Sequence, residues 1–498
     1  MSYINYIEKL KKIADINYAY GLLSWDQEVY MPENGATRRS GQIATLASVS
    51  HQLSTDNNLG SLLTALSKDA TLTTKQKRNV ELSLKDYNKS IKLPSDFVEL
   101  MSKTVSESFV AWQKAKTTND FSVFAPKLHE LVELKKKQAD LMGYENHPYD
   151  ALIDTYEPGI TTAEIDTLFK DVRNKLVPFV KQITALPQTD DSVMYQHFPK
   201  KEQWDFGIYL LEQMGYDFKS GRQDISSHPF TINFGAKDVR VTTRINENDL
   251  AEMIWSCIHE GGHALYEQGL PDDEYALPCG EAASLAIHES QSRLWENNVG
   301  RGLPYWKNNF SKAKEFFPEQ LKNCSVENFY KAMNCVKPSL IRTSADELTY
   351  HFHIMIRFEI EKSLLEGALK VAELPEYWNA KYKEYLGIDV PNNQKGVLQD
   401  IHWSHGSFGY FPTYSLGSFY AAQFYQQAKK ELPSLENEIE KGNMQPLLHW
   451  LRDKIHAHGR FYTANQLCEK ITGEKLNFSY FYEYAKEKYS GIYGVKLV

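Results

Sequence analysis

The residues best suited to chemistry lie in the segment HEGGH at positions 259–263. His259 and His263 are four residues apart, so on a helix they share one face and both imidazoles can reach one metal ion. Glu260 points beside that ion, where it can take a proton from a water molecule. The pattern predicts a metal-dependent hydrolase with Glu260 as the general base. The alternative interpretation is two partly exposed helix histidines beside an unrelated glutamate.

A catalytic zinc site needs three protein ligands and one open position. A metzincin has its third histidine six residues after the second, and here a glycine stands at that position. The following segment, 280–295, is strongly helical and contains Glu281 and Glu289. Glu281 lies at the expected helix start, where the macrodipole favours any carboxylate. Glu289 lies among apolar residues, and a buried carboxylate needs a partner. We therefore predict that His259, His263 and Glu289 bind one divalent metal ion per chain.

The helix that carries HEGGH is expected to begin after a cap at Asn248 or Asp249 and to end near Gly269. Its two central glycines are poor helix formers, but they would let another backbone or a substrate approach closely. Upstream, 228–245 alternates apolar and polar residues around a Gly-containing turn, which predicts a β-hairpin. We expect 238–245 to be an edge strand that pairs with a substrate backbone; a purely structural hairpin is the alternative.

Most of the remaining sequence has helical periodicity, which predicts a mostly helical fold with one small β-hairpin beside the HEGGH helix. No repeat of fixed period and no linker-like segment is visible. Helices are expected at the N-terminus and near 72–91, 119–142, 162–185, 201–214 and 346–369.

Composition excludes several classes of protein. The 498 residues are 42% hydrophobic and 24% charged, an ordinary globular balance. A net charge of −8 does not indicate a nucleic-acid-binding protein or a basic membrane patch. The five scattered cysteines are unlike a disulfide scaffold, and the N-terminus resembles no signal peptide. With no long apolar run, we expect a cytoplasmic protein without nucleic-acid or membrane partners.

Together these residues make the sequence similar to the M32 family of metallocarboxypeptidases, the carboxypeptidase Taq type. The resemblance spans most of the chain and rests on motifs in the family's order: HPF at 228–230, D-x-R-x-T at 238–242, HESQ at 288–291, I-R-x-x-A-D at 341–346 and G-x-x-Q-D-x-H-W at 396–403. It implies a helical, bilobed fold with a deep groove. Residues 1–498 would form a single peptidase unit with the metal-site motifs in 228–414.

The resemblance also implies an activity and partners. The expected reaction is the removal of C-terminal residues, one at a time, from peptides with a free C-terminus. The expected cofactor is Zn²⁺, with Co²⁺ as the alternative, and the expected assembly is a homodimer. Two rival functions remain: a helical glutamate-zincin that acts as an oligopeptidase or dipeptidyl carboxypeptidase, and an inactive helical scaffold.

An enzyme that acts on a free C-terminus needs a cation for the carboxylate, and a bidentate arginine is the best chemical match. Periodicity does not choose among the candidates Arg240, Arg244, Arg293 and Arg342. The resemblance selects Arg342 for the carboxylate, and it also implies substrate-binding positions at His228, Arg240 and His402.

The segment 402–414 is rich in Gly, His and Tyr and is typical of an active-site loop. Tyr410 and Tyr414, with His405 behind them, are candidates to donate a hydrogen bond to a tetrahedral oxyanion. The alternative is aromatic core packing with satisfied hydroxyls. His402 and His405 have no acidic neighbours at ligand spacing, so we do not expect a second metal site there.

Overall fold

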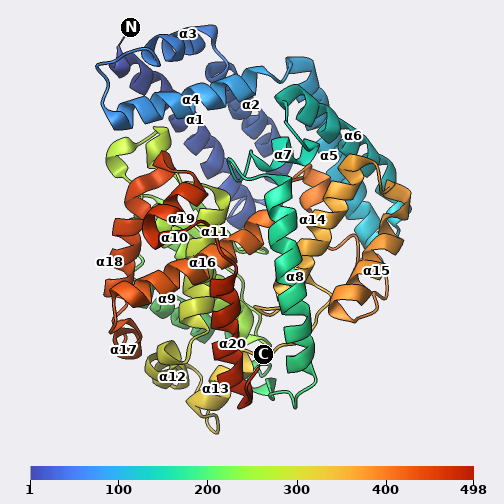
Figure 1. Ribbon diagram of the computed structural model, residues 1–498, viewed down its shortest axis with the longest axis vertical. Coiled ribbons are helices and arrows are strands. Elements are labelled where there is room, and N and C mark those ends of the chain that lie inside the picture. Colours follow the sequence, from blue (N-terminus) through green and yellow to red (C-terminus); the bar gives the residue numbers. More distant parts are fainter. Residues whose placement is uncertain (1, 498) are drawn as a thin grey trace. The chain divides into compact units, whose positions relative to one another are not determined.

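The computed structural model describes residues 2–497, and over that range it is mostly helical with one three-stranded sheet (Figure 1). The chain forms two compact units, each assembled from three separate stretches. Unit 1 contains Met1–Ile91, Asp190–Met333 and Tyr420–Leu476. Unit 2 contains Lys92–Thr189, Asn334–Phe419 and Asn477–Val498. The predicted fold class, mostly helical with one small sheet, is confirmed, while the expected groove stays a prediction.

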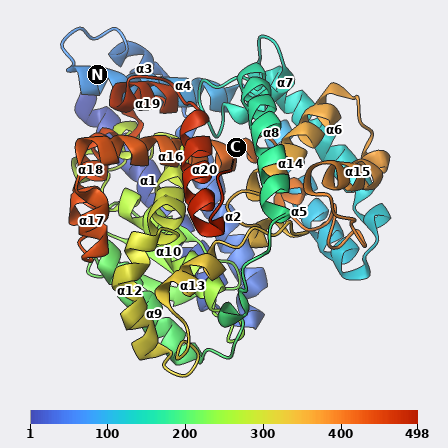
Figure 2. The ribbon, with the colours of Figure 1, turned by 60° about the horizontal axis from the view of Figure 1, so that its bottom comes forward.

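Unit 1 contains the sheet and the helix that carries HEGGH. Helices α9, α12 and α13 lie next to one another and α9 packs on α10 (Figure 2). The helices of unit 1 are α1 (Tyr3–Val29), α2 (Ala36–Ser54), α3 (Asn57–Leu66), α4 (Thr74–Ile91), α9 (Lys200–Met214), α10 (Leu250–Glu267), α11 (Leu285–Arg293), α12 (Leu303–Phe316), α13 (Val326–Met333), α17 (Leu435–Glu440), α18 (Gln445–Lys454) and α19 (Ala464–Thr472).

Unit 2 is built around α8 and α14. The rings of Phe169 on α8 and Tyr149 both meet Phe358 on α14 edge-on, each at 5.3 Å between centroids. The helices of unit 2 are α5 (Ser95–Thr118), α6 (Ala125–Met142), α7 (Pro148–Ile153), α8 (Thr162–Thr184), α14 (Tyr350–Glu366), α15 (Leu374–Leu386) and α20 (Ser479–Tyr493). Helix α16 (Pro412–Glu431) begins in unit 2, and its residues from Tyr420 onward belong to unit 1.

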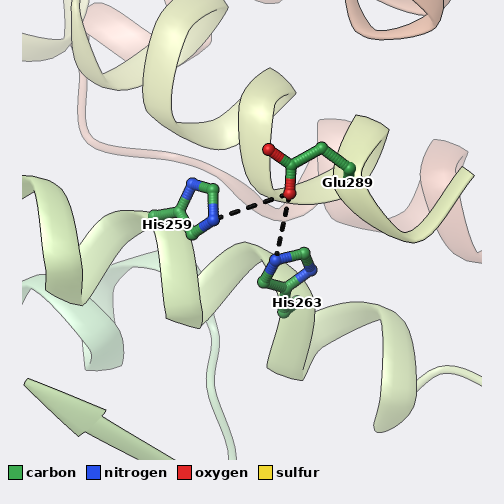
Figure 3. Close-up of side chains that lie close together, drawn as sticks. All are labelled: His259, His263 and Glu289. Atoms are coloured by element: carbon green, nitrogen blue, oxygen red, sulfur yellow. Dashed lines mark ion pairs between the residues drawn. The ribbon is translucent and has the colours of Figure 1, made fainter. Parts of the chain in front are cut away.

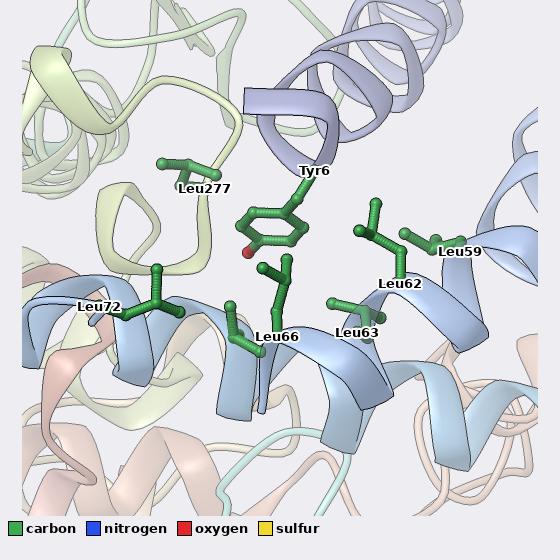
Figure 4. Close-up of a cluster of buried hydrophobic side chains, with 8 residues drawn as sticks. Tyr6, Leu59, Leu62, Leu63, Leu66, Leu72 and Leu277 are labelled. Atoms are coloured by element: carbon green, nitrogen blue, oxygen red, sulfur yellow. The ribbon is translucent and has the colours of Figure 1, made fainter. Parts of the chain in front are cut away.

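A hydrophobic cluster in unit 1 joins the N-terminal helices to the loop between α10 and α11 (Figure 4). Tyr6 of α1 is completely buried, and its hydroxyl bonds to Ser83 of α4 at 2.8 Å. Leu277, from the loop after α10, packs in the same cluster. The cluster consists of Tyr6, Leu59, Leu62, Leu63, Leu66, Leu72, Val80 and Leu277. It thereby holds one end of the segment that leads to Glu289.

The predicted hairpin is present, but its second strand is not at an edge. Strands β2 (Thr231–Asn233) and β3 (Val239–Thr243) pair antiparallel, as expected. A further strand, β1 (Gly221–Ile225), pairs parallel to the other side of β3, giving the order β1-β3-β2. The prediction that 238–245 is an edge strand is therefore wrong, because both sides of β3 are occupied. The sequence GRQDI of β1 lacks the apolar alternation that would have revealed it.

Helices α10 and α11 begin at side-chain caps. Asp249 accepts from the backbone N–H of Ala251 at 3.0 Å, which confirms one of the two expected caps. Ser284 caps α11 by accepting from Ile287 N at 3.1 Å, so that helix starts at Leu285. Glu281 consequently lies before α11, not within its first turn. Among residues 2–497, no helix combines the length and apolar character needed to cross a membrane.

Candidate metal centre

Three side chains from α10 and α11 converge in unit 1 (Figure 3). The Nε2 atoms of His259 and His263 lie 3.7 Å and 3.4 Å from Oε2 of Glu289. The ligand atoms of the three residues all lie within 4.8 Å of one another. Two imidazole nitrogens and one carboxylate oxygen form a donor set that suits a catalytic divalent ion.

The outer nitrogen of each histidine is held by a neighbour. His259 Nδ1 lies 2.9 Å from Oε2 of Glu296. His263 Nδ1 lies 3.1 Å from the carbonyl oxygen of His288 and 2.6 Å from its ring Nδ1, while His288 Nε2 contacts Glu267 at 2.7 Å. With His288 donating to the Glu267 carboxylate, its Nδ1 is an acceptor and His263 Nδ1 carries a proton. The same tautomer in both ligands leaves each Nε2 lone pair facing Glu289.

The charge states also suit a metal ion. Burial, together with His288, lowers the pKa of His263 to about 3, which keeps the ring neutral. Burial would raise the pKa of Glu289, but Arg293 and the two histidines hold it well below its usual range. Arg293 Nε donates to Oε1 of Glu289 at 2.7 Å, and the other carboxylate oxygen faces the histidines. The residues present therefore fit a divalent ion.

Glu260 lies on the sheet side of α10. Its side chain is buried, and Thr231 of strand β2 donates to its Oε2 at 2.6 Å. Burial raises the pKa of Glu260 above its ordinary value, although His259 and the Thr231 hydrogen bond act in the opposite direction. A carboxylate with a raised pKa is a better proton acceptor, as a general base requires.

A glycine permits the close approach of α10 and α11. A Cβ added to Gly262 would lie 2.7 Å from Cα of Ser292 and 2.8 Å from the carbonyl oxygen of Gln291. Both contacts are with the backbone of α11, which cannot move aside as a side chain can. A Cβ at Gly261 would instead meet the side-chain ends of Leu211 and Met214. The expectation that another backbone approaches this glycine pair is confirmed at Gly262.

Two further predicted residues, Arg240 and His228, lie on or beside the sheet. Arg240 makes a bidentate ion pair with Asp238, with both bonds at 2.8 Å, and its guanidinium stacks over Trp25 at 4.6 Å. His228 is exposed, and its carbonyl accepts from Ser226. The contacts of Arg240 are typical of a structural role, and the substrate contacts of both side chains stay predictions.

In unit 2, Arg342 belongs to a buried charged cluster. Its Nε donates to Asp400 at 3.0 Å and its Nη1 to Tyr350 at 3.2 Å. Arg357 donates to the other oxygen of Asp400 at 2.6 Å, and burial together with Arg342 lowers the pKa of His402 to about 3. Two guanidiniums share one carboxylate, so this cluster has an excess positive charge that a further carboxylate would neutralise.

The predicted loop residues lie around the same cluster, with one exception. Tyr414 lies 5.0 Å from the guanidinium of Arg342, and its hydroxyl is 3.3 Å from Nε2 of His402. The Tyr410 ring contacts Tyr414 with 5.3 Å between centroids. His405 is exposed and lies against the ring of Phe109 at 5.2 Å. The structure thus brings Arg342, His402, Tyr410 and Tyr414 together but does not join His405 to them.

Comparison with known proteins identifies the relatives of this chain. Residues 5–489 match the model of the carboxypeptidase Taq (M32) metallopeptidase family. Carboxypeptidase 1 of Bacillus subtilis is 40% identical over 494 residues, which cover 98% of each chain. This chain belongs to the M32 family. It is a metal-dependent carboxypeptidase, so the predicted family, enzyme class and requirement for a divalent metal are confirmed.

Solved structures agree with the fold of this M32 carboxypeptidase. The crystal structure of the M32 carboxypeptidase from Deinococcus radiodurans R1 matches with a TM-score of 0.97, at 37% identity over 99% of both chains. The structure of Pyrococcus furiosus carboxypeptidase matches with a TM-score of 0.95, at 36% identity over 98% of both chains.

Sequence reasoning missed the residues that hold the candidate metal ligands and the candidate general base of this M32 carboxypeptidase. Thr231 bonds to Glu260, and Glu296 bonds to His259. Arg293 is one of the candidate arginines for the substrate carboxylate, but it bonds to Glu289 and Glu296. A signal was available, because Glu289, Arg293 and Glu296 follow one another at steps of four and three on one helix face.

We predict that Gly262→Ala weakens metal binding by about tenfold or more, because the new methyl group pushes Ser292, and with it Glu289, away from the histidines. Gly261→Ala is the matched control, since flexible side chains can move away from its methyl group. Competition with a chromophoric chelator measures both affinities. Equal metal affinity in the two variants would contradict this explanation of Gly262.

Proposed function

We propose that this carboxypeptidase removes single residues from the free C-terminus of peptides. His259, His263 and Glu289 bind the metal ion in this proposal, and Glu260 is the general base. The observation that carries it is the convergence of the three ligand atoms beside a buried glutamate. The two imidazole nitrogens and the single carboxylate favour Zn²⁺, and Co²⁺ is the alternative ion for the same donor set.

When bound, the divalent ion supplies Lewis-acid chemistry, which acidifies a water molecule and polarises the scissile carbonyl. Glu260 accepts the proton of the attacking water at its carboxylate and passes it to the leaving amine. Thr231 orients the Glu260 carboxylate through Oε2. Tyr410 and Tyr414 are the proposed donors to the oxyanion. His405, which is exposed, is the third candidate for that role, behind the two tyrosines.

Arg342 binds the free carboxylate of the substrate in this proposal. Its guanidinium is held in place by Asp400 and Tyr350, so little side-chain entropy is lost on binding. The excess positive charge shared with Arg357 supports a carboxylate as the missing partner. His402, which contacts Tyr414, completes this substrate-binding group.

Strand β2 is the proposed docking edge for an extended substrate. It lies at the side of the sheet opposite β1, and its Thr231 already contacts Glu260. An extended peptide that pairs with β2 would therefore lie next to the general base. We therefore propose β2, in place of β3, as the strand that pairs with the substrate, because β3 is paired on both sides.

The proposal also covers the assembly, the extent of the peptidase unit and the cellular compartment. The homodimer and the single peptidase unit over 1–498 are proposed from the family resemblance. A reducing compartment such as the cytoplasm is supported by the five cysteines, none of which forms a disulfide in the part of the chain that the structure describes.

We expect a free-ended peptide to lose one residue at a time, and a chelator to stop the reaction until Zn²⁺ is restored. Mass spectrometry of the product ladder measures both effects. Dipeptide or internal products would favour the rival peptidases, and a metal-free, inactive protein would favour the scaffold.

Glu260→Gln is expected to retain the metal ion but to lower kcat by about 10²–10⁴-fold, because the amide cannot accept the water proton. Metal analysis and steady-state kinetics measure the two effects separately. Glu252→Gln, on the first turn of the same helix, is the control and should keep the parental rate. Turnover of Glu260→Gln at the parental rate would exclude Glu260 as the base.

Amidation of the peptide C-terminus is expected to lower kcat/KM by about 10–100-fold, the value of one or two charge-assisted hydrogen bonds. Arg342→Gln should cause a similar loss with the free peptide and little further loss with the amide. Arg173→Gln, another arginine of unit 2, is the control. Cleavage that is indifferent to amidation would exclude the carboxylate site.

A further inference from the structure

The helix that carries Glu289 does not end as an α-helix. After Arg293 it continues as a seven-residue π-helical segment, Leu294–Gly300, in which every residue is buried. Long π-helical turns are rare and frequently occur at functional sites. This segment packs directly on α10: a Cβ added to Gly300 would lie 3.1 Å from the side chain of Ile258, the residue before His259.

Glu296 of the π-helical segment has three charged or polar partners. Its Oε2 lies 2.9 Å from His259 Nδ1 and 2.9 Å from Arg293 Nη1, and its Oε1 accepts from Arg301 at 3.3 Å. The guanidinium of Arg301 stacks on Trp255, one turn before His259 on α10, at 3.9 Å. The carboxylate therefore contacts the outer side of one candidate metal ligand from a rigid, buried position.

Arg293 extends this hold to a second ligand. Its Nε donates to Oε1 of Glu289 and its Nη1 donates to Oε2 of Glu296. A planar guanidinium with fixed donor directions can bridge two carboxylates in this way, whereas an ammonium group cannot fix both. The orientation of the Glu289 carboxylate is thus coupled to the position of Glu296.

We propose that Glu296 is a positioning residue of the metal centre, which sets the tautomer of His259 directly and the orientation of Glu289 through Arg293. The inference rests on the proposed metal ligands. His263 differs from His259, since its outer nitrogen faces the backbone carbonyl and ring of His288 and no carboxylate. A side-chain substitution at Glu296 therefore removes the hold on one histidine and leaves the other in place.

The test compares the Zn²⁺ affinity of the full-length parent, Glu296→Gln and Glu296→Ala by competition with a chromophoric chelator. We expect affinity to fall by about 10-fold in the glutamine variant, which keeps one acceptor, and by up to about 100-fold in the alanine variant. The visible absorption of the Co²⁺-loaded proteins should change in the same order, because ligand geometry changes.

Arg293→Lys keeps the positive charge but loses the bridge between the Glu289 and Glu296 carboxylates. It tests the positioning role if the Glu296 variants fail to fold. Its Zn²⁺ affinity should also fall by about tenfold. Glu274→Gln is the matched control, a mostly buried carboxylate of unit 1 that contacts Lys75 and Asn79, and it should bind Zn²⁺ like the parent.

The outcomes separate this inference from the proposed function. Folded Glu296 and Arg293 variants that bind Zn²⁺ within about twofold of the parent, with unchanged Co²⁺ spectra, would overturn the positioning role alone. An equal loss of affinity in Glu274→Gln would overturn it as well, by showing a general effect of removing a buried charge. A parent protein that binds no divalent ion would instead overturn the proposed metal centre.

Discussion

The site depends on the close contact between α10 and α11 at Gly262. Because this residue has no side chain, the backbone of α11 can approach α10 at Ser292, and Glu289 reaches the two histidines from there. A buried carboxylate and two buried imidazoles are costly to desolvate unless each has a partner. The surrounding residues provide those partners: Arg293 for Glu289, Glu296 for His259, and His288 for His263.

The small sheet contributes to the same site from an adjacent side of α10. Thr243 of β3 bonds to Ser256 on that helix at 2.7 Å, so the residues of β3 that share its face point towards α10. Thr231 lies opposite Val241 in the register and therefore points the same way, where it reaches Glu260. The metal ligands and the general base thus lie on adjacent sides of one helix, and each is held by a different neighbouring element.

Local patterns in the sequence predicted much of this arrangement. The spacing of His259 and His263 placed them on one face, and the apolar surroundings of Glu289 indicated that it is buried, as it is. The turn at 235–238 predicted the hairpin. Strand β1 was missed because its sequence has no strand-like alternation, and that omission led to the wrong edge assignment for β3. The engagement of Arg240 by Asp238 was also missed, since a motif shows which residues recur and not which partners they have.

The sequence by itself determined the family, the helical fold class and the three candidate ligands, because these follow from residue type and from short spacings along single helices. Only the tertiary structure decided which strand lies at the edge of the sheet and that Glu296 contacts His259. Those relations join residues that are distant in the chain. They depend on how closely two backbones pack, and the periodicity of either segment does not contain that information.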